Sequence, residues 1–226
     1  MNDGRDRRSL REGEAAAQRP RRALPARSVT SPAVHSPGSG GAQAAPQRGE
    51  AARVSADDLR AKIREVPDFP KPGILFYDIT TLLKDAAAFK DAIDLMTKPF
   101  EDTKIDVVVG MESRGFIFSA PMAYRLDAGF VPVRKLGKLP AETVSVEYSL
   151  EYGTNTLEVH KDAIQPGDKV LIVDDLLATG GTVIGTIELV QQLKGEVAGL
   201  AFLVELLFLK GRERLKQYDV YSVVQY

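Results

Sequence analysis

Two adjacent carboxylates, Asp174 and Asp175, stand directly before a loop of small residues that runs to position 182. Gly180 and Gly181 allow this loop to turn tightly and let its backbone amides approach a ligand. Unpaired amides at a helix N-terminus, with the helix dipole behind them, favour a bound phosphate. The spacing therefore predicts an anion-binding loop with two acidic groups at its entrance.

The acidic pair restricts which anion the loop can bind. Thr179 and Thr182 add hydroxyl donors beside Ala178. Asp174 and Asp175 would repel a free phosphate, but they suit a ligand that also offers sugar hydroxyls or brings Mg²⁺. A ribose 5-phosphate meets all of these demands. The alternative is an ordinary turn between a strand and a helix, with an acidic residue capping the helix.

Other phosphate-binding motifs fit this segment less well. The nucleotide P-loop requires Gly-Lys-Ser/Thr, and residues 174–182 contain no Lys. The dinucleotide fingerprint Gly-x-Gly-x-x-Gly does not follow the preceding apolar run either. A sugar phosphate remains the ligand that the pattern favours.

The surrounding pattern predicts a sheet that positions this loop. Short apolar runs rich in β-branched residues indicate strands buried on both faces, and helical periodicity appears between them. Such alternation predicts an α/β fold with a mostly parallel central sheet flanked by helices, whose ligands bind beyond the carboxyl ends of the strands. The expected strands cover 105–109, 129–133, 169–173 and 197–204, and the expected helices cover 85–100, 115–126 and 182–193.

The amino-acid composition changes near Ser55 and separates the chain into two segments. Residues 1–54 are rich in Arg, Ala, Pro, Ser and Gly, and we expect them to form a disordered extension, because they cannot bury enough apolar surface to offset their ordering entropy. A dispensable tail, or a start codon assigned too far upstream, is the simplest interpretation of this extension, and an Arg-rich presequence or a nucleic-acid-binding arm are the alternatives. Residues 55–226 are expected to form the folded domain, beginning with a Ser55–Asp58 capping box and a helix that includes Val66.

Composition excludes several classes of function. The chain has no Cys and two His, so Cys-based zinc sites are excluded and multi-histidine sites are disfavoured, and a hard cation with oxygen ligands is the expected metal. Residues 55–226 hold 20 basic and 26 acidic residues, which argues against nucleic-acid binding by the domain. Apolar runs are far shorter than the roughly 20 residues of a membrane span, and a cytoplasmic protein is expected.

At this point the sequence resembles the type I phosphoribosyltransferases, over residues 55–226. The Lys-Leu-Pro and Ser-Leu-Glu-Tyr-Gly segments are similar to those of the members that act on adenine. The resemblance implies a small N-terminal hood and a mobile loop, here Gly137–Asn155, added to the α/β fold. The similar segments are Pro67–Gly73, Phe76–Thr80, Glu112–Phe116, Arg134–Pro140, Tyr148–Gly153 and Val170–Thr182.

The resemblance also implies an activity. A homodimer would convert adenine and phosphoribosyl pyrophosphate (PRPP) to AMP and pyrophosphate in purine salvage, with Mg²⁺ carried mainly by pyrophosphate and no dedicated protein ligand. A regulator that kept the fold and senses PRPP is the competing class, although residues 1–54 show no pattern for a DNA-reading module.

The resemblance assigns residues to each part of the substrates. Many family members carry Arg at the position of Tyr77, and backbone contacts to adenine remain available there. The alternatives are a core position for Phe76, a solvent-facing Glu151, a solvated hairpin face for the lysines, and a helix cap for Ser113 beside an exposed Arg114. The assignments are ribose 5-phosphate for Asp174, Asp175, Ala178, Thr179, Gly180, Gly181 and Thr182; pyrophosphate for Ser113, Arg114, Lys135 and Lys138; adenine for Leu75, Phe76, Tyr77 and Leu176; and catalysis for Glu151, Tyr152, Arg114, Asp174 and Asp175.

Overall fold

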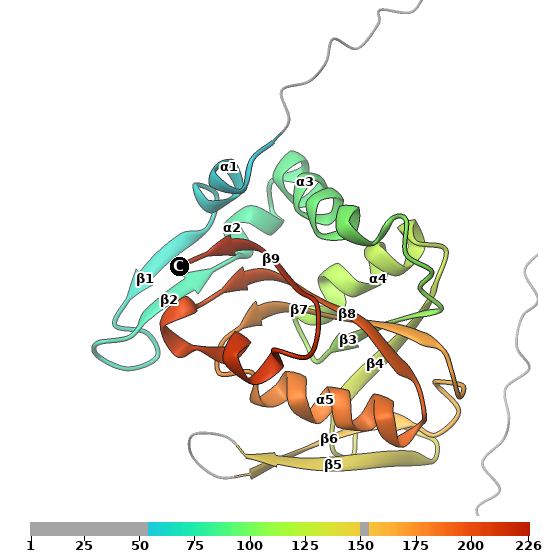
Figure 1. Ribbon diagram of the computed structural model, residues 1–226. Coiled ribbons are helices and arrows are strands. Elements are labelled where there is room, and N and C mark those ends of the chain that lie inside the picture. The colour runs from blue at the N-terminus through green and yellow to red at the C-terminus, as the bar shows by residue number, and fades with distance from the viewer. Residues whose placement is uncertain (1–53, 150–153) are drawn as a thin grey trace, which may run out of the picture. The chain divides into compact units, whose positions relative to one another are not determined.

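A computed structural model describes residues 54–149 and 154–226, and its main feature is a seven-stranded sheet (Figure 1). The strand order is β5-β6-β4-β3-β7-β8-β9, and the pairs from β4 to β9 are parallel, whereas β5 and β6 add antiparallel strands at one edge. This confirms the predicted α/β fold. The strands are β3 (Val107–Met111), β4 (Gly129–Lys135), β5 (Thr143–Ser149), β6 (Thr154–His160), β7 (Lys169–Leu177), β8 (Glu196–Glu205) and β9 (Val220–Gln225).

Alternation along the central strands builds a separate core on each face of the sheet. In β3, Val108 packs in a cluster with Phe118, whereas Val109 packs in a second cluster with Ile187. Successive side chains of a strand point to opposite faces, so a strand covered on both faces must be apolar throughout. All five residues of β3 are buried, which explains why these strands appear in the sequence as continuous apolar runs.

Three helices supply most of the covering layers (Figure 1). The helices α3 (Ala86–Thr97) and α4 (Gly115–Arg125) cover one face, and α5 (Gly181–Gln192) covers the other. Asp85 caps α3 by accepting hydrogen bonds from the amides of residues 87 and 88, and a 3₁₀ turn (Lys98–Phe100) follows the helix. All three predicted helices are confirmed to within a few residues.

A small N-terminal part precedes the main sheet and corresponds to the expected hood. It contains α1 (Ala56–Arg60), the antiparallel pair β1 (Arg64–Pro67) and β2 (Leu75–Asp78), and α2 (Thr80–Leu83). The Ser55–Asp58 capping box is present. The helix predicted to include Val66 is wrong in extent, because Val66 lies in β1 and pairs with Phe76 of β2.

Three further differences from the predicted elements affect the site. The strand expected to end at Val173 continues to Leu177, so Asp174 and Asp175 lie inside β7. The segment expected to be a loop, Gly137–Asn155, contains all of β5 and the start of β6, and its residues 150–153 lie outside the described part. The strand β9 was not predicted. Among the described residues, no helix is both long and apolar enough to cross a membrane.

Candidate active site

The acidic pair lies near the carboxyl end of β7, between α4 and the loop that begins α5. Asp175 is 5% exposed, and its Oδ2 lies 2.8 Å from Arg114 Nε. The amide of Asp175 donates to Asp174 Oδ1 at 2.9 Å. Asp174 lies against the first residue of α4, because a Cβ built on Gly115 would be 2.7 Å from Asp174 Oδ1. Gly115 therefore leaves the space that this carboxylate occupies.

Burial dominates the electrostatics of both carboxylates. Loss of solvent raises the pKa of Asp174 well above its ordinary value, and the neighbouring charge of Asp175 raises it further. Burial also raises the pKa of Asp175, but the Arg114 guanidinium opposes that rise. Negative charge on the pair is therefore costly in this poorly solvated place, and a ligand that brings hydroxyl donors or positive charge would stabilise it.

The small-residue loop has the geometry of an anion site. Gly180 has φ of 79°, the left-handed conformation that glycine adopts without strain. The helix α5 begins at Gly181, and none of the described side chains caps it. Ala178, Thr179 and Thr182 are partly buried around this helix start. A helix start without a side-chain cap leaves amides that an anion could bind.

A polar pocket of about 390 Å³ joins the acidic pair to the loop. It combines the end of β3, the end of β4, β6 and the β7–α5 connection. Predicted residues that line it are Ser113, Arg114, Lys135, Asp174, Asp175, Leu176, Ala178 and Thr182, and residues that sequence reasoning did not assign are Glu112, Tyr148, Asn155 and Leu157. Most of the predicted phosphate and pyrophosphate residues therefore surround one cavity.

Glu112 explains how two strand ends are held together at this pocket. Its carboxylate accepts hydrogen bonds from Arg134 Nε and from the backbone amide of Lys135, each at 3.2 Å. Lys138 does not line the pocket, and its Nζ lies 3.7 Å from Glu112 Oε1. Burial opposes ionisation of Glu112, but Arg134 and the Lys135 amide outweigh it and lower the pKa. The Glu-Ser-Arg segment was the available signal for this residue.

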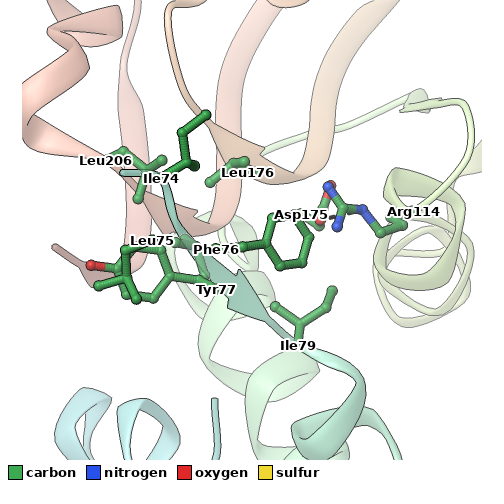
Figure 2. Close-up of a pocket in the computed structure, with 10 residues that line it drawn as sticks. Ile74, Leu75, Phe76, Tyr77, Ile79, Arg114, Asp175, Leu176 and Leu206 are labelled. Atoms are coloured by element: carbon green, nitrogen blue, oxygen red, sulfur yellow. Dashed lines mark ion pairs between the residues drawn. The ribbon is translucent and has the colours of Figure 1, made fainter. Parts of the chain in front are cut away.

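An apolar pocket of about 100 Å³ adjoins the polar one (Figure 2). The Phe76 ring points toward Arg114, whose Cζ lies 5.8 Å from the ring centroid, and Phe69 packs edge-on at 5.2 Å. The structure therefore places Phe76 in a pocket wall and only partly buries it. The lining comprises the four predicted base-site residues Leu75, Phe76, Tyr77 and Leu176, together with Ile74, Ile79, Arg114, Asp175, Val204 and Leu206.

The ring of Tyr77 is held by a contact that the sequence did not indicate. It stacks on Tyr226 with centroids 3.7 Å apart, and the Arg60 guanidinium covers the Tyr226 ring at 4.4 Å. Burial raises the pKa of both tyrosines. This stack joins β2 to the residue that follows β9, so it fixes the strand that carries Phe76.

The two pockets share part of their walls. Arg114, Asp175 and Leu176 line both of them. An apolar compartment and a polar compartment thus meet at one ion pair. Glu151 and Tyr152, the remaining predicted catalytic residues, lie outside the described residues.

Comparisons with known proteins agree with this geometry. Residues 78–225 match the model of the phosphoribosyl transferase domain family. Adenine phosphoribosyltransferase from Koribacter versatilis is 62% identical over 170 residues, which is 75% of this chain and 93% of that protein. The adenine phosphoribosyltransferase structure from Thermoanaerobacter pseudethanolicus is 55% identical with a TM-score of 0.74, and the match covers 76% of this chain and 100% of that one.

A further solved structure has ligands in its site. Adenine phosphoribosyltransferase from Saccharomyces cerevisiae, complexed with adenine and an imino-altritol bisphosphate, is 42% identical with a TM-score of 0.71. The match covers 75% of this chain and 98% of the yeast chain.

Proposed function

From the premise that this chain belongs to the phosphoribosyltransferase family, we propose the following reaction and roles for its residues. The protein is an adenine phosphoribosyltransferase: it converts adenine and PRPP to AMP and pyrophosphate, a reaction of purine salvage. One observation carries the proposal. An acidic pair, of which Asp175 is buried and Asp174 partly buried, precedes a helix start and lies where a polar and an apolar pocket meet.

The ribose 5-phosphate part of PRPP occupies the polar pocket. The segment Ala178–Thr182 binds the 5-phosphate through its amides and hydroxyls. Asp174 and Asp175 accept hydrogen bonds from the 2- and 3-hydroxyls of ribose. Their raised pKa values fit this role, because sugar hydroxyls would add donors to carboxylates that are poorly solvated.

The pyrophosphate part lies toward the ends of β3 and β4. Ser113, Arg114, Lys135 and Lys138 bind it, and the Arg114 guanidinium can contact two oxygens at once. We propose Mg²⁺ as the cofactor, carried mainly by the oxygens of pyrophosphate and with no dedicated protein ligand, because Mg²⁺ prefers hard oxygen donors and the pocket lining is rich in oxygen atoms that suit it. When bound, Mg²⁺ neutralises charge on the leaving pyrophosphate.

Adenine occupies the apolar pocket. Leu75, Phe76, Tyr77 and Leu176 form its walls, and the Phe76 ring offers a face for stacking. The Tyr77 ring is engaged by Tyr226, so its contribution to the base is made through the backbone.

Positioning and electrostatics account for the chemistry. As the bond from C1 to pyrophosphate lengthens, its electron pair leaves with pyrophosphate and positive charge grows on the ribose. The nearby acidic pair stabilises that charge, and Arg114 stabilises the departing anion. Adenine N9 then attacks C1 from the opposite face. Glu151 holds or accepts the purine proton, beside Tyr152, when the segment Gly137–Asn155 closes over the site and excludes water.

The remaining proposals concern the whole chain. Family membership supports a homodimer in the cytoplasm, and sedimentation equilibrium of the purified protein tests the dimer. The family match begins at residue 78, which supports treating residues 1–54 as an extension of the domain formed by 55–226.

A competition assay tests the function. The protein is mixed with PRPP, Mg²⁺ and equimolar adenine, hypoxanthine, guanine, xanthine and orotate, and the nucleotides are identified by mass. AMP as the main product, lost when Mg²⁺ is chelated, is the expected result. A different nucleotide would overturn the assignment of the apolar pocket. No product, with PRPP still bound, would favour a regulator that senses PRPP.

A further inference from the structure

The phosphate loop rests on a segment that the mechanism does not use. After β8 the chain forms two 3₁₀ turns, η2 (Leu207–Leu209) and η3 (Gly211–Leu215), before returning to β9. The amide of Leu206 donates to the carbonyl of Leu177 at 3.0 Å, so this segment follows the end of β7. The start of η3 then lies directly against the loop.

Contact between η3 and the loop is made backbone to backbone. A Cβ built on Gly211 would lie 2.1 Å from the carbonyl oxygen of Ala178 and 3.1 Å from the amide nitrogen of Gly180. In return, a Cβ on Gly180 would lie 3.1 Å from the carbonyl oxygen of Gly211. Arg214 also donates to the carbonyl of Thr179 at 3.3 Å. A shift of η3 would therefore move the loop that binds the 5-phosphate.

A buried carboxylate determines where η3 lies. Glu205, the last residue of β8, is 2% exposed, and it accepts hydrogen bonds from Arg212 Nε at 2.9 Å and from Arg212 Nη2. Arg212 also donates to the carbonyl of Val220 at 2.8 Å and to Ser222 Oγ at 3.0 Å. The arginine thus joins η3 to both β8 and β9.

The backbone before Gly211 needs such an anchor. Lys210 has φ of 54°, a left-handed conformation that is unfavourable for a side chain with a Cβ. Strained residues of this kind persist where the surrounding contacts fix them. The bidentate Arg212–Glu205 pair, one residue from the close contact at Gly211, supplies that restraint.

We propose that Arg212 and Glu205 are positioning residues for the ribose 5-phosphate site. They touch no substrate; they hold η3 as the support of the phosphate loop and thereby set the affinity for PRPP. This inference rests on the proposed role of Ala178–Thr182. A small displacement of binding groups is costly, since a misplacement of about 1 Å can reduce a rate about 100-fold.

The test separates positioning from general stability. Arg212→Met and Glu205→Gln remove the ion pair. Arg212→Lys keeps the positive charge but lacks the planar guanidinium. Gly211→Ala keeps both charges and places a Cβ against the carbonyl of Ala178. Glu196→Gln is the matched control, because Glu196 pairs with Lys169 at the opposite end of β8. For each folded variant, calorimetry gives the Kd of ribose 5-phosphate, and kinetics give the KM values for PRPP and adenine.

We expect Arg212→Met, Glu205→Gln and Gly211→Ala to raise the Kd of ribose 5-phosphate and the KM for PRPP about tenfold. The KM for adenine should stay within about twofold, Arg212→Lys should recover part of the affinity, and Glu196→Gln should match the wild type. If Arg212→Met does not fold, the Kd of Arg212→Lys decides, because this variant keeps the charge and loses the bidentate contact with Glu205.

Two results would overturn the inference. Wild-type affinity for ribose 5-phosphate in folded Arg212→Met or Gly211→Ala would show that the support does not act on the loop. Equal losses for both substrates would show only general disorder of the site. The assignment of the loop itself is checked separately by Gly181→Asp: if that variant binds ribose 5-phosphate normally, the proposed function of the loop fails and the inference fails with it.

Discussion

At the scale of single residues, the two neighbouring aspartates have different surroundings. Asp174 lies against the start of α4 and forms no ion pair with any of the described residues, whereas Asp175 Oδ2 lies 2.8 Å from Arg114 Nε. Arg114 is 41% exposed, so it can turn to water or to pyrophosphate, whereas Asp175 cannot leave the pocket. Asp175 is therefore the fixed partner of the pair and Arg114 the adjustable one.

The substitution Asp175→Asn tests the fixed partner. An amide of the same shape keeps the packing but loses the negative charge that stabilises the sugar cation. We expect kcat to fall about 100-fold, with a small change in the free energy of unfolding. Steady-state kinetics with thermal unfolding as the control measure both, and an unchanged kcat would remove the proposed role.

The pH dependence of PRPP use should depend on Arg114. Burial raises the pKa of Asp175 and Arg114 opposes that rise, so activity should decline as pH falls through the raised pKa of the pair. In Arg114→Met the opposing charge is gone, the pKa of Asp175 rises further, and the acid limb of kcat/KM for PRPP should move to higher pH. A limb at the same pH in both proteins would argue against an ionised Asp175 in the reaction.

At the scale of elements, the proposed anion site combines the end of a strand, a loop and the start of a helix. The strand β7 carries the carboxylates near its end, Gly180 has a left-handed backbone, and α5 begins at Gly181, next to Thr182, which lines the polar pocket. Gly181→Asp adds a negative charge to the start of this helix. We expect no measurable binding of ribose 5-phosphate by calorimetry, because the new carboxylate would repel the 5-phosphate in a poorly solvated site.

Gly129→Asp is the control for this change, because it places the same residue at the amino end of β4, away from the loop. It should bind ribose 5-phosphate as the wild type does. Micromolar affinity retained in Gly181→Asp would show that the phosphate binds elsewhere.

The hood hairpin depends on a carboxylate at the end of β2. The Arg64 hydrogen bond, helped by Thr80, lowers the pKa of Asp78 from 3.8 to about 2. A lowered pKa gives stability that is present above the ordinary value and is lost as pH falls toward about 2. Asp78→Asn should therefore be less stable than the wild type at neutral pH and equally stable near pH 2.

Urea unfolding at several pH values measures this difference, with Asp102→Asn, an exposed acid outside the hairpin, as the control. A gap between wild type and Asp78→Asn that does not change with pH would mean that the contribution of Asp78 is not ionic.

At the scale of the whole molecule, the sequence indicated the central strands and the covering helices but not the edges. The strands β3, β7 and β8 are buried along most of their length and appear as apolar runs, whereas β4 is only partly buried. The strand β5 is half exposed. Its alternation, with Val144, Val146 and Tyr148 packing toward the second core, indicates a strand in a segment where we expected a loop.

The parts of the site that could be predicted are those whose residues are adjacent in the sequence. The acidic pair and its loop are adjacent in the sequence, so their chemistry was visible there. Val204, Asn155 and Leu157 reach the pockets only through strand order and register, which local patterns do not specify. The stack of Tyr77 on Tyr226 likewise joins residues at opposite ends of the described chain.

The wall shared by the two pockets has a thermodynamic consequence. Arg114, Asp175 and Leu176 line both compartments, so a ligand that reorients Arg114 in one changes the surface offered to a ligand in the other. Linkage requires this effect to be reciprocal: adenine alters the affinity for ribose 5-phosphate by the same factor by which ribose 5-phosphate alters the affinity for adenine. Adenine and ribose 5-phosphate do not react with each other, so calorimetry can titrate either ligand into the protein with the other one bound. A coupling factor of one would mean that neither ligand changes the residues that line both pockets. Any other value would mean that the two compartments are coupled, and the residues that line both are the place to look for the coupling.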